Sequence, residues 1–468
     1  MANDLVVFVP GIMGSVLRDA EGKDVWNLTP GVAGSVLFGL ERYFERLTLP
    51  PGIGNEAPET SAPHALSSHG LLKEPRIWPG LMPHVAYKKL ARHLGGLAAG
   101  RMVVFPYDWR LSNRHSAGLL KAFVERELGR WTEECRALGK TGERAPKVVF
   151  VCHSMGGLVA RYYLEVLGGR ETARSLVTIG TPYAGAVKAV QALTGTFPGR
   201  KFRAVPARLR DRLIEAARSM PAVHQLLPTY QCVDGYPEGT RLEDVSVPDL
   251  DTAMVRDAFD FRRELGAHIR DNVAADRASG RPDAYQLFAS GGRGEPTDVL
   301  LRLSAGQLTY DDRFPGDTRW QGDGTVPCLS ATPPDWADGA RVDWFRLGHT
   351  ALPNDVHLHR QLLDRYEALE HRPYQTLSMG FGVDVPEAVA KGEPLEVAAV
   401  SEEDGLFLES RLVSPATGEV LERRRVLPVD DGRYRAVFDP PPGLWLVEVE
   451  APRVPNAAVQ QETVVVLD

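Results

Sequence analysis

The stretch VVFVCHSMGG, residues 148–157, places a serine between an apolar run and two glycines. The four apolar residues Val148–Val151 are typical of a strand in a parallel sheet that is covered on both faces. After Ser154, apolar side chains recur at helical spacing from Leu158 to Leu167. The stretch therefore predicts a strand, a sharp turn with Ser154 at its tip, and a helix.

Other apolar runs of the same kind occur on both sides of this stretch. They lie at Leu5–Val9, Val103–Phe105, Leu176–Ile179, Gln286–Ala289 and Val342–Leu347. Helical patterns separate them, for example around Leu119–Val124 before the Ser154 strand. Alternation of strands and helices predicts an α/β fold with a doubly wound parallel sheet.

Two segments interrupt this alternation, and the end of the chain changes character. Residues of about 26–80 and about 184–280 are predicted to be cap or lid insertions in an α/β domain that spans residues 1–372. From residue 373 to residue 468, short runs alternate apolar and polar residues between turn signals such as Asp430-Asp431-Gly432. This pattern predicts a small all-β, immunoglobulin-like sandwich.

Composition narrows the classes of function. The 468 residues carry a formal net charge of -7, so no basic excess is present to bind nucleic acid. The four cysteines lack metal-ligand spacing, and no cofactor or metal is predicted. The first residues, MANDLVVFVPG, do not have the pattern of a signal peptide, and no apolar stretch has the length of a membrane span. We expect a cytoplasmic location, while export without a signal stays open.

Downstream of Ser154 are residues that would make it a nucleophile. A serine hydroxyl needs a base to take its proton and a carboxylate to orient that base. Asp323 lies in the loop QGDGTVP, and His349 follows directly on the last predicted strand. The order Ser154, Asp323, His349 suits a catalytic triad at the carboxyl ends of parallel strands.

Other residues compete for the same roles. Asp317 and Asp355 are alternative acids, and His357 and His359 are alternative bases at the start of the last predicted helix. His153 adjoins the serine, but we expect its side chain to point away from it.

An oxyanion hole requires two backbone amides. The amide of Met155, directly after the serine, is the first candidate. The second is the amide of Ile12, in the turn that follows the first strand. A glycine-rich turn without this role is the alternative for Ile12.

Seven motifs follow one another along the chain. They are VPGIMGS, PYDWRLS, CHSMGG, IGTPYAG, SMPAVHQLLP, GDGTVP and GHTALPND. With these motifs, residues 5–370 resemble the lecithin:cholesterol acyltransferase-like family of α/β-hydrolases. The resemblance implies acyl-ester chemistry on lipids with nucleophile Ser154, acid Asp323, base His349 and oxyanion amides of Ile12 and Met155. Secreted members of the family pin a membrane-contacting loop with a disulfide, whereas residues 26–80 contain no cysteine here.

The expected function is therefore a serine ester hydrolase, of lipase or phospholipase A type, with acyl transfer to an alcohol left open. A soluble short-chain carboxylesterase is one alternative, and a non-catalytic binding scaffold is another. The basic segment 198–212 is either a peripheral membrane contact or a solvated face of the cap. Leu37-Phe38 and Tyr43-Phe44 either line an acyl pocket or pack the insertion. A protein partner is expected, if anywhere, at the C-terminal β-domain.

Overall fold

The computed structural model describes most of the chain. It covers residues 4–27, 44–50, 62, 64–72, 87–97, 101–139, 145–197, 207–279, 284–313, 322–336, 341–367, 381–386, 388–401, 406–415, 417–430, 433–452 and 459–467. The predicted domain boundary at 372/373, the rival acid Asp317 and Leu37-Phe38 lie outside these ranges.

The first part of the fold is a six-stranded sheet with the order β12-β9-β7-β6-β1-β5. All neighbouring strands are parallel, as predicted from their continuous apolar sequences. The strands are β1 (Leu5–Val9), β5 (Arg101–Val104), β6 (Val148–His153), β7 (Ala173–Ile179), β9 (Gln286–Gly292) and β12 (Asp343–Phe345). Every residue of β1 and of β6 is buried, so this sheet is the centre of the core.

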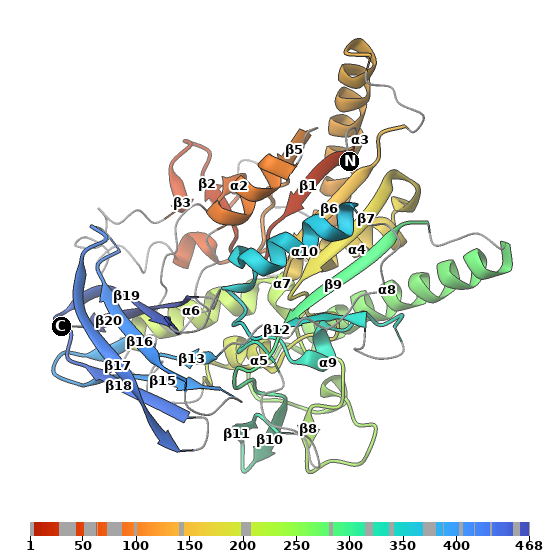
Figure 1. Cartoon of the computed structure of the whole chain (residues 1–468). Helices are drawn as coiled ribbons and strands as arrows, with labels where there is room; N and C mark the ends of the chain where they lie inside the picture. Colours follow the sequence, from red (N-terminus) through yellow and green to blue (C-terminus); the bar gives the residue numbers. More distant parts are fainter. Residues whose placement is uncertain are drawn as a thin grey trace.

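Helices cover both faces of this sheet (Figure 1). One face packs on α3 (Asn113–Ala137) and α4 (Met155–Glu165), with α8 (Thr252–Ser279) outside α4. The other face packs on α2 (Lys88–Leu97) and α10 (Val356–Glu367). Val7 and Phe8 belong to these two opposite cores, as the alternation of side chains along a strand requires. The predicted α/β-hydrolase class is confirmed.

The predicted insertions contain more strand than their sequences indicated. Near the first insertion, β2 (Ser15–Arg18), β3 (Asp24–Trp26) and β4 (Ser67–Leu71) form a small sheet. The second insertion is mostly helical, with α5 (Val187–Thr194), α6 (Ala207–Ser219), α7 (Pro221–His224) and α8. It also contains β8 (Val233–Asp234), which pairs with β10 (Leu300–Ser304) of the hairpin that β10 forms with β11 (Gln307–Asp311). Short helical turns are η2 (Arg170–Thr172), η4 (Leu242–Asp244), α9 (Cys328–Ala331) and η6 (Leu352–Asn354).

The C-terminal part is a separate all-β unit, here called the C-terminal β-domain (described residues of 381–467). Its eight strands have the order β13-β15-β18-β17-β16-β19-β20-β14. They are β13 (Gly382–Asp384), β14 (Ala388–Ala390), β15 (Leu395–Val400), β16 (Leu408–Val413), β17 (Val420–Asp430), β18 (Arg433–Phe438), β19 (Gly443–Glu450) and β20 (Gln460–Leu467). The two halves of the sheet meet at β17, which pairs with β16 up to Val426 and with β18 from Leu427. Both halves enclose one core, so the predicted second, all-β domain is confirmed.

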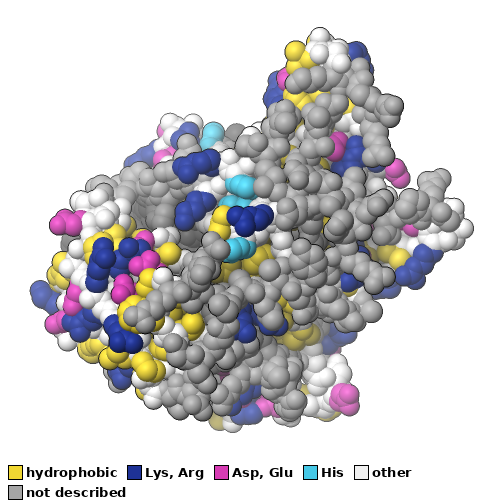
Figure 2. All heavy atoms as spheres, viewed as in Figure 1, with side chains coloured by type: hydrophobic (Ala, Val, Ile, Leu, Met, Phe, Trp, Pro, Cys, Tyr) yellow, Lys and Arg dark blue, Asp and Glu magenta, His cyan; other side chains and the backbone are white. Residues whose placement is uncertain are grey.

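Two surface features bear on the predicted partners. Leu209, in the basic segment 198–212, and Leu213, directly after it, are buried, while residues 198–206 lie outside the described ranges. Over the C-terminal strands, basic, acidic and hydrophobic side chains are mixed (Figure 2). Within the part of the chain that the structure describes, no helix has both the length and the apolar character of a membrane span.

Candidate active site

Ser154 lies at the turn between β6 and α4, at the carboxyl edge of the sheet. Its backbone has φ 51° and ψ −127°, a conformation that side-chain-bearing residues adopt rarely. Two bonds hold it there: Ser154 N donates to Ile179 O at 2.8 Å, and Thr181 Oγ1 donates to Ser154 O at 2.9 Å. The turn is therefore the sharp elbow that the sequence predicted.

Small residues around the elbow allow α4 to approach β1 closely. A Cβ atom on Gly156 would lie 2.5 Å from the carbonyl oxygens of Val9 and Pro10, and one on Gly157 would overlap Thr181. Cys152, two residues before the serine, is fully buried, and burial raises the pKa of its thiol well above the usual range. Cys152 therefore acts as a small apolar residue of the strand.

The structure brings Ser154, His349 and Asp323 together in one hydrogen-bonded chain. Ser154 Oγ lies 2.9 Å from His349 Nε2, and His349 Nδ1 lies 2.7 Å from Asp323 Oδ2. Because a carboxylate only accepts, Nδ1 carries the ring proton and Nε2 accepts from the serine hydroxyl. All three residues are buried. Asp323 is held in turn by its Oδ1, which accepts from the amides of Thr325 and Val326.

Two of the alternative residues, Asp355 and His359, make other contacts. Asp355 Oδ1 accepts from the amides of His357 and Leu358 at the start of α10, so it caps that helix. His359 Nε2 donates to Pro353 O at 2.9 Å, and its ring stacks on His93.

A second hydrogen-bonded chain runs beside the first, through Tyr87 and His153. The hydroxyl of Tyr87 accepts from Gly11 N and donates to His153 Nδ1, both at 2.9 Å. His153 Nε2 then donates to the backbone oxygen of His349 at 3.3 Å. Burial lowers the pKa of His153 well below its usual value of 6.5, and the nearby His349 adds to this effect. A neutral ring in this tautomer links the turn after β1 to the backbone of His349.

The turn after β1 provides a limited choice of oxyanion donors. Gly11 N is bound to Tyr87, and Gly14 N donates to Gly11 O. Of the described amides in this turn, those of Ile12 and Met13 remain without a backbone partner, and the side chains of both residues line the cavity at Ser154. Met155 N begins α4, where the first amides of a helix have no partner within the helix. The two predicted donors, Ile12 and Met155, thus stay available.

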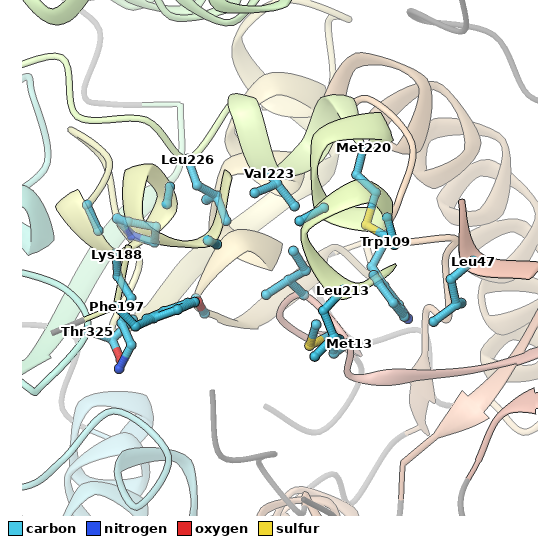
Figure 3. A pocket seen from close by; sticks show the side chains of 18 of the residues that line it. Met13, Leu47, Trp109, Lys188, Phe197, Leu213, Met220, Val223, Leu226 and Thr325 are labelled. Atoms are coloured by element: carbon cyan, nitrogen blue, oxygen red, sulfur yellow. The ribbon is translucent and has the colours of Figure 1, made fainter. Parts of the chain in front are cut away.

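A mostly apolar cavity opens at Ser154 (Figure 3). It encloses about 880 Å³ of empty space, part of it open to solvent. Side chains from α5, α6, α7 and several loops line it, including Leu47, Trp109, Leu213, Met220 and Val223. Phe44 also lines it, so one residue of the predicted Tyr43-Phe44 pair contacts the cavity. The cationic Lys188 is at one side and donates to Gly324 O at 3.3 Å.

Some residues of this site were not predicted from the sequence, among them Tyr87 and Thr181. Tyr87 belongs to no motif, and its partners Gly11 and His153 are 76 and 66 residues away in the chain. Thr181, in contrast, directly follows a predicted strand in IGTPYAG, and that position could have suggested its contact with the elbow. Among the described residues, no cluster of three or more His, Cys, Asp or Glu side chains is suited to hold a metal ion.

One comparison with known proteins matched a family model to part of the chain that contains the serine elbow. Residues 76–249 match the family model of lecithin:cholesterol acyltransferase, and this range includes Ser154. A search of curated proteins found no match.

Two solved structures illustrate the fold comparisons. The Tle4-Tli4 complex contains a chain 16% identical, with 77% of this chain and 97% of that chain covered at a TM-score of 0.47. The lipase BlEst2 of Bacillus licheniformis, in its propeptide form, is 13% identical at a TM-score of 0.34. The match covers 99% of this chain and 73% of the lipase chain. Residues 76–249 thus match the lecithin:cholesterol acyltransferase family, and the parallel sheet with its serine elbow has the architecture of an α/β-hydrolase.

Proposed function

We propose that this chain is a serine ester hydrolase that cleaves lipid esters through an acyl-serine intermediate, as a lipase or a phospholipase A does. The observation that carries the proposal is the hydrogen-bonded chain from Ser154 through His349 to Asp323 at the mouth of an apolar cavity. The family match supports activity on lipid esters, by hydrolysis or by acyl transfer.

In the first step, Ser154 Oγ attacks the ester carbonyl carbon, and His349 Nε2 accepts the hydroxyl proton. Asp323 keeps the imidazole in the required tautomer and stabilises the positive charge that forms on it. The amides of Ile12 and Met155 donate to the oxyanion of the tetrahedral intermediate. The positive end of the α4 dipole, at the N-terminus of the helix, also stabilises the negative charge of the oxyanion.

Collapse of the intermediate transfers the proton from His349 to the leaving alcohol and leaves the acyl group on Ser154. Water, or a second alcohol, then attacks the acyl-serine with His349 again as the base. Water gives hydrolysis and an alcohol gives acyl transfer, and the same residues serve both outcomes.

The cavity favours lipid esters over short-chain esters. A short acyl group would leave most of the space along Trp109, Leu213 and Met220 unfilled, while a long chain would bury apolar surface there. Each buried methylene contributes about 0.8 kcal/mol, so several of them give a large preference for long chains. A soluble short-chain carboxylesterase remains the second candidate, to be tested with the same substrates.

The test compares turnover of short-chain esters, long-chain esters and phospholipid vesicles, together with labelling by a fluorophosphonate probe. We expect labelling at Ser154 and faster turnover of the long-chain esters. Ser154→Ala should lose both labelling and turnover, while Ser304→Ala, at an exposed position, should keep both. Normal turnover by Ser154→Ala would exclude the mechanism, and an unlabelled wild-type chain without turnover would favour a non-catalytic scaffold.

A further inference from the structure

The residues that follow β9 support the loop of the proposed triad acid. This acid loop, residues 322–326, runs beside Glu295. Glu295 N donates to Gly322 O at 3.1 Å, and bridges join Glu295 to both Gly322 and Asp323. Glu295 is itself buried, with 6% of its surface exposed.

Thr297 fastens the same loop on the other side of Asp323. Its Oγ1 donates to Glu295 O at 3.0 Å and accepts from Gly324 N at 2.8 Å. A Cβ atom on Gly322 would lie 2.5 Å from this oxygen, so the loop is in close contact with Thr297. The two residues flanking Asp323 are therefore both tied to the segment 295–297.

The side chain of Glu295 fills the space between the loops of the proposed acid and base. A Cβ atom on Gly324 would lie 3.6 Å from Glu295 Cβ, and one on Gly348 would lie 3.8 Å from Glu295 Oε1. Gly324 follows Asp323 and Gly348 precedes His349. His349 N also donates to Asp323 O at 2.8 Å, so a shift of one loop is passed to the other.

The far end of the Glu295 side chain contacts the C-terminal β-domain. Its Oε1 accepts from Val383 N at 2.9 Å. Val383 is in β13, an edge strand that pairs with β15 and lies beside the α/β part in Figure 1. Burial raises the pKa of Glu295 well above its usual range, and the carboxylates of Glu462, Asp384 and Asp323 add to this effect. A raised pKa favours the neutral carboxyl, which brings less negative charge close to Asp323.

We propose that Glu295 is a positioning residue through which the C-terminal β-domain holds the acid loop in its place at His349. The contact with Val383 fixes the end of the Glu295 side chain, and its stem and backbone fix the acid loop. The β-domain is thereby part of the support of the active site. The inference rests on the proposed function, because it concerns the residues of the same triad.

Two pairs of variants separate this role from general stability. Glu295→Ala removes the acceptor and the stem, while Glu295→Gln keeps a neutral side chain of equal length with an acceptor oxygen. Val383→Pro removes the donor N–H of an edge strand, where proline is tolerated, but it also fixes φ and changes the side chain. Val383→Ala shortens the side chain and keeps that N–H. Glu419→Ala, at an exposed turn of the same domain, is the control.

We expect Glu295→Ala and Val383→Pro to lower kcat by about tenfold to a hundredfold, because small displacements of a catalytic group have effects of this size. KM should change little, since the cavity is untouched. Glu295→Gln, Val383→Ala and Glu419→Ala should remain close to the wild type. The double variant Glu295→Ala/Val383→Pro should lose no more than Glu295→Ala alone, because Glu295→Ala already breaks the contact with Val383.

The rate of fluorophosphonate labelling at Ser154 should follow kcat in all variants, and near-ultraviolet circular dichroism should confirm that each is folded. The inference would be overturned if Glu295→Ala had the kcat of the wild type, or if Glu295→Ala and Glu295→Gln lowered kcat equally. If Val383→Pro does not fold, the Glu295 pair alone decides. A wild-type chain that is not labelled at Ser154 refutes the proposed function itself, so the two failures are distinct.

Discussion

Replacing Tyr87 by phenylalanine tests how the second hydrogen-bonded chain supports the site. The change removes one oxygen atom and leaves the ring in its edge-on contact with Phe8, at a centroid distance of 5.0 Å. Tyr87 is 1% exposed, so water does not replace the hydroxyl. Gly11 N and His153 Nδ1 both lose their partner in this variant.

The expected cost follows from these two bonds. Each buried polar group left without a partner lowers the free energy of unfolding by about 1–3 kcal/mol. Part of this loss is offset, because the variant has no tyrosine hydroxyl to desolvate when it folds. We therefore expect the free energy of unfolding to fall by about 2–4 kcal/mol. The turn after β1 should also loosen. Because Ile12 follows Gly11 directly, kcat should fall, by less than the roughly 10²–10³ that loss of one oxyanion donor costs.

Urea-induced unfolding followed by tryptophan fluorescence measures the first effect, and ester turnover measures the second. Tyr236→Phe, in which the tyrosine is 39% exposed, is the matched control and should change neither. If the free energy of unfolding of Tyr87→Phe lies within about 0.5 kcal/mol of the wild-type value, the two hydrogen bonds do not contribute to stability as described. If stability falls while kcat is unchanged, the chain supports the fold but not the oxyanion turn.

Three further predictions concern the acid, the cavity and pH. Asp323→Asn should lower kcat by about 10⁴ with unchanged circular dichroism, because an amide does not enforce the required tautomer; a loss below about tenfold would argue against Asp323 as the acid. Leu213→Trp should fill the cavity and shift the preference towards shorter acyl chains, whereas Leu119→Trp, at an exposed site, should not; equal chain-length profiles would contradict the assigned acyl site. His153 stays neutral when folded and takes up a proton when unfolded below about pH 6.5, so the free energy of unfolding should fall as pH drops from there. His153→Asn should make this fall shallower by up to about 1.4 kcal/mol per pH unit in urea unfolding at pH 4.5–7.5, and an unchanged slope would show that His153 does not titrate as described.

Much of the fold followed from local patterns in the sequence. Fully buried parallel strands are continuous apolar runs, so β1 and β6 were recognisable. Strand β17, in contrast, was not predicted. Its sequence VLERRRVLPVD contains successive charged residues, because much of its length is exposed where the sheet bends.

In the candidate site, too, some residues could be predicted from the sequence and others could not. Ser154 follows β6, Asp323 lies in the loop QGDGTVP, and His349 follows β12 after a short loop. Hydrogen bonds join the three side chains, as their order along the chain predicted. Glu295 and Tyr87 have no such signal, since their roles depend on contacts between segments up to 88 residues apart. The side chain of a single buried residue is fixed by tertiary packing, which a local pattern does not contain.

The long separations within the site set an order of events during synthesis. Ser154 and its elbow leave the ribosome early, but His349 is 195 residues further along and Val383 further still. On the proposed mechanism, a nascent chain holds its nucleophile without a base until the last strand of the α/β sheet has been made. Hydrolytic activity therefore arises only when the translation of the α/β part is nearly complete, and the full support of Asp323 arises later still. A partly synthesised chain that contacts lipid would not cleave it.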